Sequence, residues 1–450
     1  MMSNNLKLSR YLKIREKNGF VAIFHELHPD PVYCKKDEWV RFEKEIAEHS
    51  DDNLFRMLHK RFLLVASDLD DTLEFEEASV HLEQKLNQPT ILYLMMAQEC
   101  NLACKYCPFS KTAEKYGRNT MLSEEDAFAG INLWKNHLDE VYDSNKQYFI
   151  VFYGGEPLLN KKVIKKVLQY VEELSCSGKL IDKNLNFAIS TNGILFDHQM
   201  IELCKEYNIL VTVGLDGPTA KYNDFRVDPI GQETFDETVL SIKSLVKNGI
   251  RTCASVSITP TNVDQIKNYG EFFEGLGVEK FGFNFLKGRL LLESIPFEEV
   301  KDFYLKASKG IIENAKLQRK KNFEFQMEKK IVAFETGDFF PIDCTCYGNQ
   351  IVIQPNGQIS NCPFFRSELG HVRSINPDFR IWDTRVVKEW RRRLPLYYKG
   401  FRDMDSKSLC GGGCAWSSYE LNGSFLAIDE ASKIFTQEVF NELIWSRFSY

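Results

Sequence analysis

Three cysteines in one short segment are the residues of this chain best suited to bind a metal. Cys100, Cys104 and Cys107 follow one another in the spacing C-x3-C-x2-C, directly after the apolar run TILYLMM at 90–96. Soft thiolate ligands suit an iron–sulfur cluster, in which each cysteine binds a different iron. Three ligands leave the fourth iron of such a cluster open to a small molecule, whereas a structural zinc site needs a fourth protein ligand. The spacing alone leaves zinc and a redox dithiol as alternatives.

Five further cysteines form a second group near the C-terminus. They are Cys344, Cys346, Cys362, Cys410 and Cys414, and three glycines separate the last two. Grouped thiols in a reduced protein favour a metal site, either an iron–sulfur cluster or a zinc knuckle, because thiolate spacing does not identify the metal. The other four of the 12 cysteines lie singly among periodic apolar residues, where a free cysteine behaves as a small hydrophobe. They are Cys34, Cys176, Cys204 and Cys253, and we interpret them as structural.

The bulk composition is that of a globular protein rather than a polyanion binder. Apolar residues make up 44% of the 450 residues and charged residues 27%, and the formal net charge is -6. This balance disfavours nucleic acid as a partner. The N-terminal segment lacks the apolar core of a signal peptide, and no apolar run is long enough to span a bilayer. We therefore expect a cytoplasmic protein of about two to four domains, with no membrane partner and with reduced cysteines.

The elements that must position the first cysteine group follow from the pattern after residue 90. Short β-branched or aromatic runs alternate there with amphipathic helical patterns, which is typical of βα units and a parallel sheet. Six strands are predicted, at 90–96, 147–155, 184–193, 209–217, 251–260 and 280–288. Six units are fewer than the eight of a closed barrel. We therefore expect an α/β fold with an open, partial (β/α)6 TIM-like barrel and a site at the C-terminal ends of its strands.

Two smaller units are predicted on either side of this barrel, which we place at residues 86–318. Residues 1–85 predict a small α+β domain, with strands at 10–16 and 21–27, helices at 37–48 and 52–64, and a solvated acidic linker at 67–77. Residues 319–450 predict a helical connector at 319–340, loops around the second cysteine group at 341–417, and a C-terminal amphipathic helix at 430–448. The barrel should therefore carry the first cysteine group, and the C-terminal unit the second.

Motifs at four successive strand ends together resemble the radical S-adenosylmethionine (SAM) superfamily. The C-x3-C-x2-C loop follows the first strand, and Gly154, Gly155, Glu156 and Pro157 form a GGEP motif after the second. The third strand ends in Ser190-Thr191-Asn192-Gly193, and the fourth in Gly214-Leu215-Asp216-Gly217-Pro218, followed by Asn223-Asp224-Phe225-Arg226. The last two segments are similar to those of the subgroup that modifies peptides and proteins. The resemblance covers about residues 90 to 300.

This resemblance implies a [4Fe–4S] cluster on Cys100, Cys104 and Cys107, with SAM on its open iron. It further implies that Glu156 accepts a hydrogen bond from the methionyl ammonium, that Arg226 binds the methionine carboxylate, and that Tyr106 lies against adenine. The other residues implied in SAM binding are Gly154, Gly155, Pro157, Thr191, Asn192 and Gly214. Two positions depart from the family pattern: Gly214 replaces the usual Ser, whose hydroxyl contact is lost, and Asn223 replaces a common Asp.

The second cysteine group resembles the SPASM or twitch type of auxiliary-cluster domain. The match, Cys346-x10-Gly357-x4-Cys362 followed by Cys410 and Cys414, implies one auxiliary [4Fe–4S] cluster. Its implied ligands are Cys344, Cys346, Cys362 and Cys414, and Cys410 is the remaining candidate. The full family pattern serves two clusters, but no cysteine lies between 363 and 409 or after 414. A second auxiliary cluster is therefore not expected.

These resemblances imply an enzyme that reductively cleaves SAM to a 5′-deoxyadenosyl radical and removes hydrogen from a ribosomally synthesised precursor peptide. The outcome would be a crosslink, an epimerised residue or an excised backbone fragment, and no catalytic side chain is expected beyond the cluster. The strand–strand–helix–helix order of residues 1–85 is similar to that of winged-helix-like leader-binding domains, in which a leader peptide adds a strand to a sheet edge. A sulfatase-type maturase is less expected, because Pro363 follows Cys362.

The expected partners are a precursor peptide with its leader and an electron donor such as flavodoxin or ferredoxin. Two other classes of protein stay open from the sequence. One is a radical SAM enzyme that acts on a small-molecule biosynthetic intermediate. The other is an iron–sulfur electron-transfer or scaffold protein.

Overall fold

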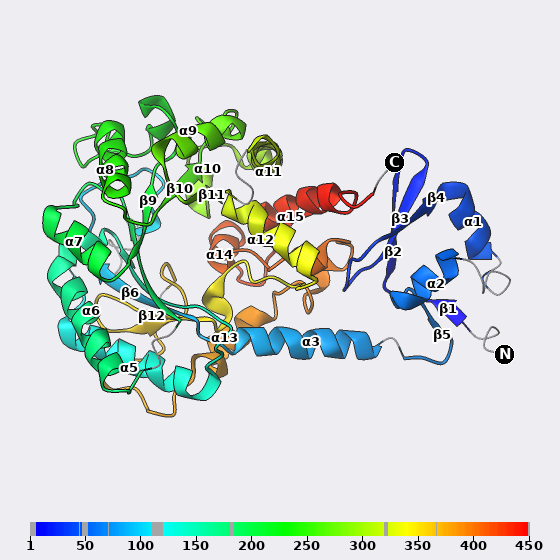
Figure 1. Cartoon of the computed structure of the whole chain (residues 1–450), viewed down its shortest axis with the longest axis horizontal. Coiled ribbons are helices and arrows are strands. Elements are labelled where there is room, and N and C mark those ends of the chain that lie inside the picture. Colours follow the sequence, from blue (N-terminus) through cyan, green and yellow to red (C-terminus); the bar gives the residue numbers. More distant parts are fainter. Residues whose placement is uncertain are drawn as a thin grey trace.

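The computed structural model is elongated, with a parallel sheet and its helices at one end and a small α+β unit at the other (Figure 1). It describes residues 6–44, 46, 53–70, 72–109, 120–180, 184–318, 323–365 and 367–448. Helix α3 (Thr72–Leu86) extends between the two ends. In this described part of the chain, no helix is both long and apolar enough to cross a membrane.

The six predicted barrel strands are confirmed. They are β6 (Ile91–Ala97), β7 (Tyr148–Gly154), β8 (Leu185–Thr191), β9 (Leu210–Gly214), β10 (Thr252–Ile258) and β11 (Lys280–Phe285), and each pairs in parallel with the next. Side chains of a strand point alternately to its two faces. In β7, Tyr148, Ile150 and Phe152 are buried in the main core, whereas Tyr153 lines the cavity described below. The α/β fold with a partial, mainly parallel barrel is therefore present.

Helices cover the outer face of this sheet (Figure 1). They are α5 (Glu124–Val141), α6 (Lys161–Cys176), α7 (His198–Glu206), α8 (Phe235–Lys247), α9 (Tyr269–Leu276) and α11 (Val300–Leu317), with a short α10 (Arg289–Leu292) after β11. Their apolar stripes pack on the sheet: Trp134, Ile164 and Leu168 are fully buried members of the main core. This packing positions the strand ends relative to one another.

Two strands of the main sheet were not predicted, because residues 341–417 were assigned to loops. β12 (Gln350–Ile353) pairs in parallel with β6, from Gln350 opposite Ile91 to Ile353 opposite Leu94, and β13 (Ile359–Ser360) pairs with β12. Strands this short among loops carry no clear periodic signal. The division of the chain at residue 318 stays a prediction, but the sheet itself continues across it.

The N-terminal unit is α+β, as predicted, and contains two small antiparallel sheets. β1 (Leu6–Leu8) pairs with β5 (Leu64–Ala66), and β2 (Leu12–Lys17), β3 (Phe20–His25) and the unpredicted β4 (Val32–Lys35) form the other, beside α1 (Lys36–Lys44) and α2 (Asn53–Lys60). Residues 45, 47, 48 and 52 of the predicted helices lie outside the described residues. Val21 and Ile23 bury one face of β3 against the helices, and Phe24 on the other face contacts Phe440, with ring centroids 5.2 Å apart.

The prediction of a solvated linker at 67–77 is wrong in its second half, because α3 begins at Thr72. Only Ala78, Leu82 and Leu86 of this helix are buried, so its apolar stripe is narrow and the acidic residues dominate the sequence pattern. Glu76 and Glu77 are exposed, but Glu74 makes a contact, with its Oε2 atom 2.6 Å from the Nε2 atom of His25 in β3. The helix thereby anchors the N-terminal unit.

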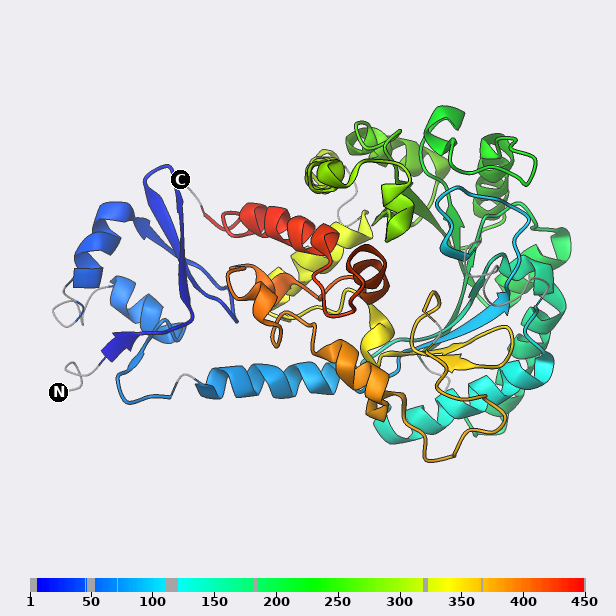
Figure 2. The same cartoon turned by 180° about the vertical axis from the view of Figure 1, so that it is seen from behind.

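The C-terminal segment lies between the barrel and the N-terminal unit (Figure 2). Its helices are α12 (Phe325–Thr336), α13 (Arg385–Arg391), α14 (Ala415–Asn422) and α15 (Glu430–Leu443). The predicted helices at 319–340 and 430–448 are therefore present in part, and residues 319–322 of the first lie outside the described residues. This arrangement places the second cysteine group beside the barrel.

Candidate functional site

A cavity lies at the C-terminal ends of the barrel strands, where the sequence predicted the site. The first cysteine group lines it, with Cys100, Cys104 and Cys107 all at its wall. Most of the residues implied in SAM binding line it too: Tyr106, Gly154, Gly155, Thr191, Asn192, Gly214 and Arg226. Glu156 and Pro157 are buried but do not line this cavity. The structure thus brings together residues from five segments of the chain.

The cysteine loop is held by backbone hydrogen bonds to the segment that follows β9. The Ala103 amide donates to the Val227 carbonyl (2.8 Å), and the Lys105 amide donates to the Phe225 carbonyl (2.9 Å). These bonds satisfy backbone groups in a segment without regular secondary structure. They fix the loop against the chain that carries Arg226, so the thiols and the guanidinium keep a defined separation.

A side chain at the end of β8 contacts the first thiol. The Asn192 amide nitrogen donates to Asn101 Oδ1 (2.8 Å) and to Cys100 Sγ (3.6 Å). Burial raises the pKa of Cys100 to about 12 and that of Cys104 to about 11, so ligation of a metal must displace their protons. Among the described residues, no three His, Cys, Asp or Glu side chains are grouped for a single metal ion. In an iron–sulfur cluster, by contrast, each cysteine binds a different iron.

Two glycines let the backbone after β7 pass directly against the backbone that enters the cysteine loop. The Gly155 amide donates to the Ala97 carbonyl (2.9 Å), and the Glu156 amide donates to the Glu99 carbonyl (2.8 Å). A Cβ atom on Gly155 would lie 2.1 Å from Glu99 O, and one on Gly154 would lie 2.5 Å from Ala97 O. Both contacts are with backbone atoms, so only glycine fits at either position.

The Glu156 carboxylate connects the ends of β7 and β8. It accepts hydrogen bonds from the Thr191 hydroxyl (2.7 Å), the Asn192 amide (2.9 Å) and the Leu158 amide (3.0 Å), and it is fully buried. Burial raises the pKa of Glu156 although these donors stabilise its charged form. The carboxylate therefore positions the two strand ends in this structure. Its contact with a methionyl ammonium stays a prediction.

Arg226 lies against β9 and takes part in a buried polar chain. Its Nη1 atom donates to the Tyr106 hydroxyl (2.8 Å), which donates to Asp216 Oδ2 (2.5 Å). A Cβ atom on Gly214 would lie 2.7 Å from both terminal nitrogens of Arg226. The glycine that replaces the family's usual Ser therefore makes room for this guanidinium. The Tyr106 ring stacks on Phe225 with centroids 6.2 Å apart, and its contact with adenine stays a prediction.

The second departure from the family pattern also has a structural reason. Asn223 Oδ1 accepts a hydrogen bond from the Asp216 amide (2.7 Å), while Asn223 Nδ2 donates to the carbonyls of Gly217 (3.0 Å) and Thr219 (2.7 Å). A carboxylate can accept but not donate. In this loop an amide therefore satisfies three backbone groups, whereas the common Asp would satisfy only one.

Four of the five C-terminal thiols lie close enough to act on one another electrostatically. Burial raises the pKa of Cys346, and its hydrogen bond with Cys344 and the charges of Cys362 and Cys414 raise it further. The same hydrogen bond lowers the pKa of Cys344 to about 6. These four are the ligands that the resemblance implies for an auxiliary cluster. Their assignment stays a prediction, and their proximity agrees with it.

Cys410 has different surroundings. Burial raises its pKa to about 11, and the charged groups that act on it are Asp343 and Lys330 rather than the other thiols. It packs in a small apolar cluster with Phe401 and Met404. The structure therefore separates this candidate from the four thiols that act on one another.

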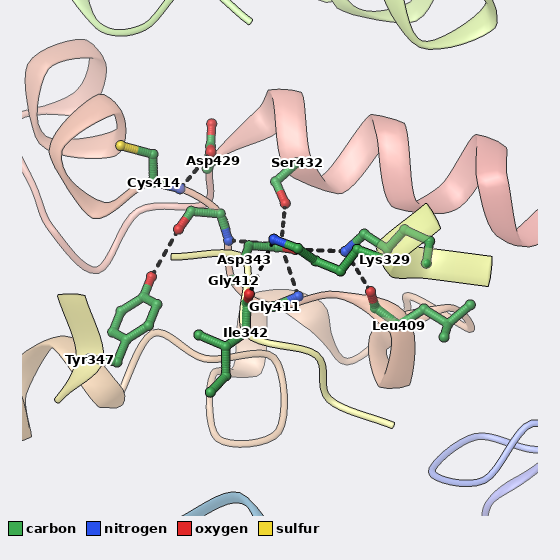
Figure 3. A network of polar contacts seen from close by, with 12 residues as sticks. Lys329, Ile342, Asp343, Tyr347, Leu409, Gly411, Gly412, Cys414, Asp429 and Ser432 are labelled. Carbon is green, nitrogen blue, oxygen red and sulfur yellow. Dashed lines mark hydrogen bonds and ion pairs between the residues drawn. The ribbon is translucent and has the colours of Figure 1, made fainter. Parts of the chain in front are cut away.

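A partly buried aspartate holds the glycine loop that leads to Cys414 (Figure 3). Asp343 Oδ2 accepts hydrogen bonds from the Gly411 amide (2.9 Å), the Gly413 amide (3.2 Å) and the Ser432 hydroxyl (2.8 Å), and Lys330 Nζ lies 2.7 Å from its other oxygen. The Cys414 amide in turn donates to Asp429 Oδ2 (2.7 Å). These bonds preorganise the loop. The sequence did not predict this role, because Asp343 lies 68 residues from Gly411.

Several cavity residues were not predicted. They include Phe109, Asn284, Lys287, Phe364 and Trp416. Asn284 lies near the end of β11 and Lys287 lies just beyond it. Their position at a strand end was the feature of the sequence that could have predicted them. Phe364 and Trp416 lie two residues beyond Cys362 and Cys414, and only the packing of the C-terminal segment decides which part of the barrel they reach.

Known proteins similar to this chain share its barrel region. Residues 94–273 match the family model of the radical SAM superfamily. A serine-type anaerobic sulfatase-maturating enzyme of Bacteroides thetaiotaomicron is 28% identical over 190 residues, which cover 41% of this chain and 43% of that protein. The antilisterial bacteriocin subtilosin biosynthesis protein AlbA of Bacillus subtilis is 24% identical over 330 residues, 71% of this chain and 65% of that protein. The chain thus spans less than two thirds of the length of these relatives.

A solved structure shares the fold over most of the chain. Native anSMEcpe with bound AdoMet and the Cp18Cys peptide superposes with a TM-score of 0.63 at 19% identity, covering 79% of this chain and 98% of that chain. At this identity the likeness supports the fold alone.

The glycine contacts at the cysteine loop lead to a testable expectation. Gly155→Ala should separate the loop from the end of β7, because its Cβ would collide with Glu99 O. We expect loss of most of the iron bound at the first cysteine group and weaker SAM binding, measured by iron analysis and calorimetry of the anaerobically reconstituted protein. The matched control is Gly275→Ala in α9, where no atom lies within 4 Å of the added Cβ. Equal iron content in the two variants would contradict the role assigned to Gly155.

Proposed function

We propose that this chain, whose residues 94–273 match the radical SAM superfamily, is a radical SAM enzyme that modifies a ribosomally synthesised precursor peptide at the cavity above the barrel. Its cofactors, a [4Fe–4S] cluster and SAM, supply the electron and the carbon-centred radical that abstracts hydrogen from an unactivated carbon. The observation that carries the proposal is a single cavity lined by both the cysteine loop and the C-terminal segment. A substrate there would lie between two cysteine groups.

The residues at the cavity fit the cofactors of this chemistry. We propose that Cys100, Cys104 and Cys107 hold the cluster, because three soft ligands on one loop leave an iron open. Arg226 lines the cavity, and its buried Nε atom has no hydrogen-bond partner within the described part of the chain. A buried donor without a partner is costly, and the methionine carboxylate is an acceptor that would satisfy it.

The four C-terminal thiols fit one auxiliary cluster. We propose that Cys344, Cys346, Cys362 and Cys414 are its ligands, since these thiols influence one another and Cys410 does not share their surroundings. Four thiolates are the ligand set of a closed iron–sulfur cluster. The bonds around Asp343 would hold the site in place before the metal binds.

The wall of the cavity suits the side chain of a peptide. Phe109, Phe285, Leu290, Phe364 and Trp416 supply an apolar surface near the cysteine loop. Such a surface can hold a target carbon by apolar contacts, while polar residues such as Ser255, Ser257 and Asn284 line other parts of the cavity. The protein's part in the reaction is then positioning and containment rather than acid–base catalysis.

The N-terminal unit supports a peptide as the substrate class. Its three-stranded sheet has the order β2-β3-β4, so β2 and β4 are edge strands within the described residues. An extended peptide can pair with such an edge through backbone hydrogen bonds. We propose that this winged-helix-like unit binds the leader of the precursor. The related sulfatase-maturating enzyme and subtilosin biosynthesis protein agree with a substrate made of amino acids.

The cluster assignment can be tested by comparing a cysteine of the first group with a buried cysteine of the core. Cys104→Ala should abolish formation of 5′-deoxyadenosine from SAM under dithionite, because it removes one ligand of the first cluster. Cys204→Ala, at a core position in α7, should leave that activity largely intact. Chromatography of anaerobic reactions measures the product. Equal loss in both variants would reject the assignment, and an active parent enzyme that never responds to a peptide would favour a small-molecule substrate.

The auxiliary assignment is tested by counting iron. The reconstituted parent should hold roughly eight irons per chain, because each of two [4Fe–4S] clusters contributes four. Cys362→Ala should lower the count to about four, whereas Cys410→Ala should retain most of the eight. Zinc in place of iron at the second site would reject the auxiliary cluster. If Cys410→Ala lost iron and Cys362→Ala did not, Cys410 rather than Cys362 would be a ligand of the auxiliary cluster.

Leader binding is tested by removing the N-terminal unit. A chain without residues 1–66, which retains α3, should bind the full precursor about tenfold more weakly or worse, because strand addition supplies main-chain hydrogen bonds. Its cleavage of SAM without peptide should stay near the parental rate. A precursor lacking its leader is the matched control and should bind both forms equally. Unchanged affinity for the full precursor would reject the proposed leader site.

A further inference from the structure

Lys287 lies where the cavity meets the C-terminal segment. It follows β11 and lines the cavity together with Phe364 and Trp416. The next residue is tied to the second cysteine group, because the Gly288 amide donates to the Ser417 hydroxyl (3.2 Å). The Ser417 amide in turn donates to Cys414 Sγ (3.4 Å). Two hydrogen bonds therefore connect the backbone beside Lys287 to a proposed cluster ligand.

The charged groups that face Lys287 are those of the second cysteine group. Charge on Cys414 raises the pKa of Lys287, burial opposes this, and Cys344, Asp429 and Cys362 add to the increase. Within the described residues, the ammonium makes no hydrogen bond or ion pair. Lys287 is only partly exposed, and a cation that is partly withdrawn from water without a partner is unfavourable unless negative charge lies nearby. The thiols are the largest source of that charge.

The neighbouring cations already have partners. Lys330 Nζ lies 2.7 Å from Asp343 Oδ1 and donates to the Leu409 carbonyl (2.7 Å). The Arg393 guanidinium donates to the Tyr347 hydroxyl and to backbone carbonyls. These contacts fold the loop and engage the Lys330 ammonium and both terminal nitrogens of Arg393, while Arg393 Nε has no partner within the described residues.

Lys329 is the other cation on this side of the C-terminal segment. It donates to the Ile342 carbonyl at 3.4 Å, and burial lowers its pKa. Lys287 differs from it, because Lys287 lines the cavity and keeps all its donors available.

We propose that the Lys287 ammonium is the counter-charge of the auxiliary cluster and raises its reduction potential. This inference rests on the proposed function, in which Cys344, Cys346, Cys362 and Cys414 hold that cluster. Reduction adds one electron, and hence one negative charge, to the cluster and its thiolates. A fixed positive charge nearby stabilises the reduced form more than the oxidised form, and a buried site of low dielectric strengthens the effect. Lys287 thereby couples the substrate cavity to the redox properties of the second site.

The test isolates the auxiliary cluster and measures its potential. In a chain carrying Cys100→Ala, Cys104→Ala and Cys107→Ala, only the second site can hold iron. Lys287→Met is introduced into this background to remove the charge, and Lys287→Arg to retain it. Lys301→Met, on the exposed surface of α11, is the matched control. Dithionite titration followed by electron paramagnetic resonance gives the midpoint potential, with iron content measured on each sample.

We expect Lys287→Met to shift the midpoint to a more negative potential, while Lys287→Arg and Lys301→Met stay near the parental value. An unchanged midpoint in Lys287→Met at full iron content would overturn the inference. If that midpoint were unchanged while the full-length enzyme lost peptide affinity, Lys287 would be a ligand of a substrate carboxylate instead. A triple-alanine background without iron would overturn the proposed auxiliary cluster itself, which separates that failure from a failure at Lys287.

Discussion

The close backbone contact between the end of β7 and the entry to the cysteine loop is the constraint on which the site depends. Gly155 approaches Glu99 so closely that no Cβ atom fits, and backbone hydrogen bonds continue across the contact. Glu156 connects this contact to the end of β8, because its buried carboxylate accepts hydrogen bonds from Thr191 and Asn192. The Asn192 side-chain amide in turn donates a hydrogen bond to Cys100 Sγ in the cysteine loop. Three strand ends and the thiol loop therefore form one connected network, and a shift in any part moves the thiols.

The C-terminal segment is part of the same assembly. β12 extends the barrel sheet beside β6, and Phe364 and Trp416, which follow two of the thiols, reach the cavity. The second cysteine group is consequently held at a defined position relative to the first. Lys287 lies at this junction, on the barrel side. The cavity is thus lined on one side by the loop of the first cysteine group and on the other by residues that follow two thiols of the second group.

Departures from a family pattern can be explained only when the neighbouring side chains are known. Gly214 in place of a serine looks like a lost contact in the sequence, yet in the structure it provides the space occupied by Arg226. Asn223 in place of an aspartate supplies two donor bonds that a carboxylate cannot make. Each departure is thus compensated by a partner within the same loop. Both substitutions are accommodated within this segment, and the Arg226 guanidinium still lines the cavity.

The sequence by itself determined which residues could bind metal and that the first cysteine group follows a barrel strand, because ligand spacing and the residue pattern of a strand are local properties. The six barrel strands and the thiol loop were predicted on that basis. Only the tertiary structure decided that β12 pairs with β6, that Cys410 stands apart from the other four thiols, and that the Glu156 carboxylate binds protein donors. These features depend on contacts between segments far apart in the chain. The spacing of residues within one segment does not indicate which distant side chain packs against that segment.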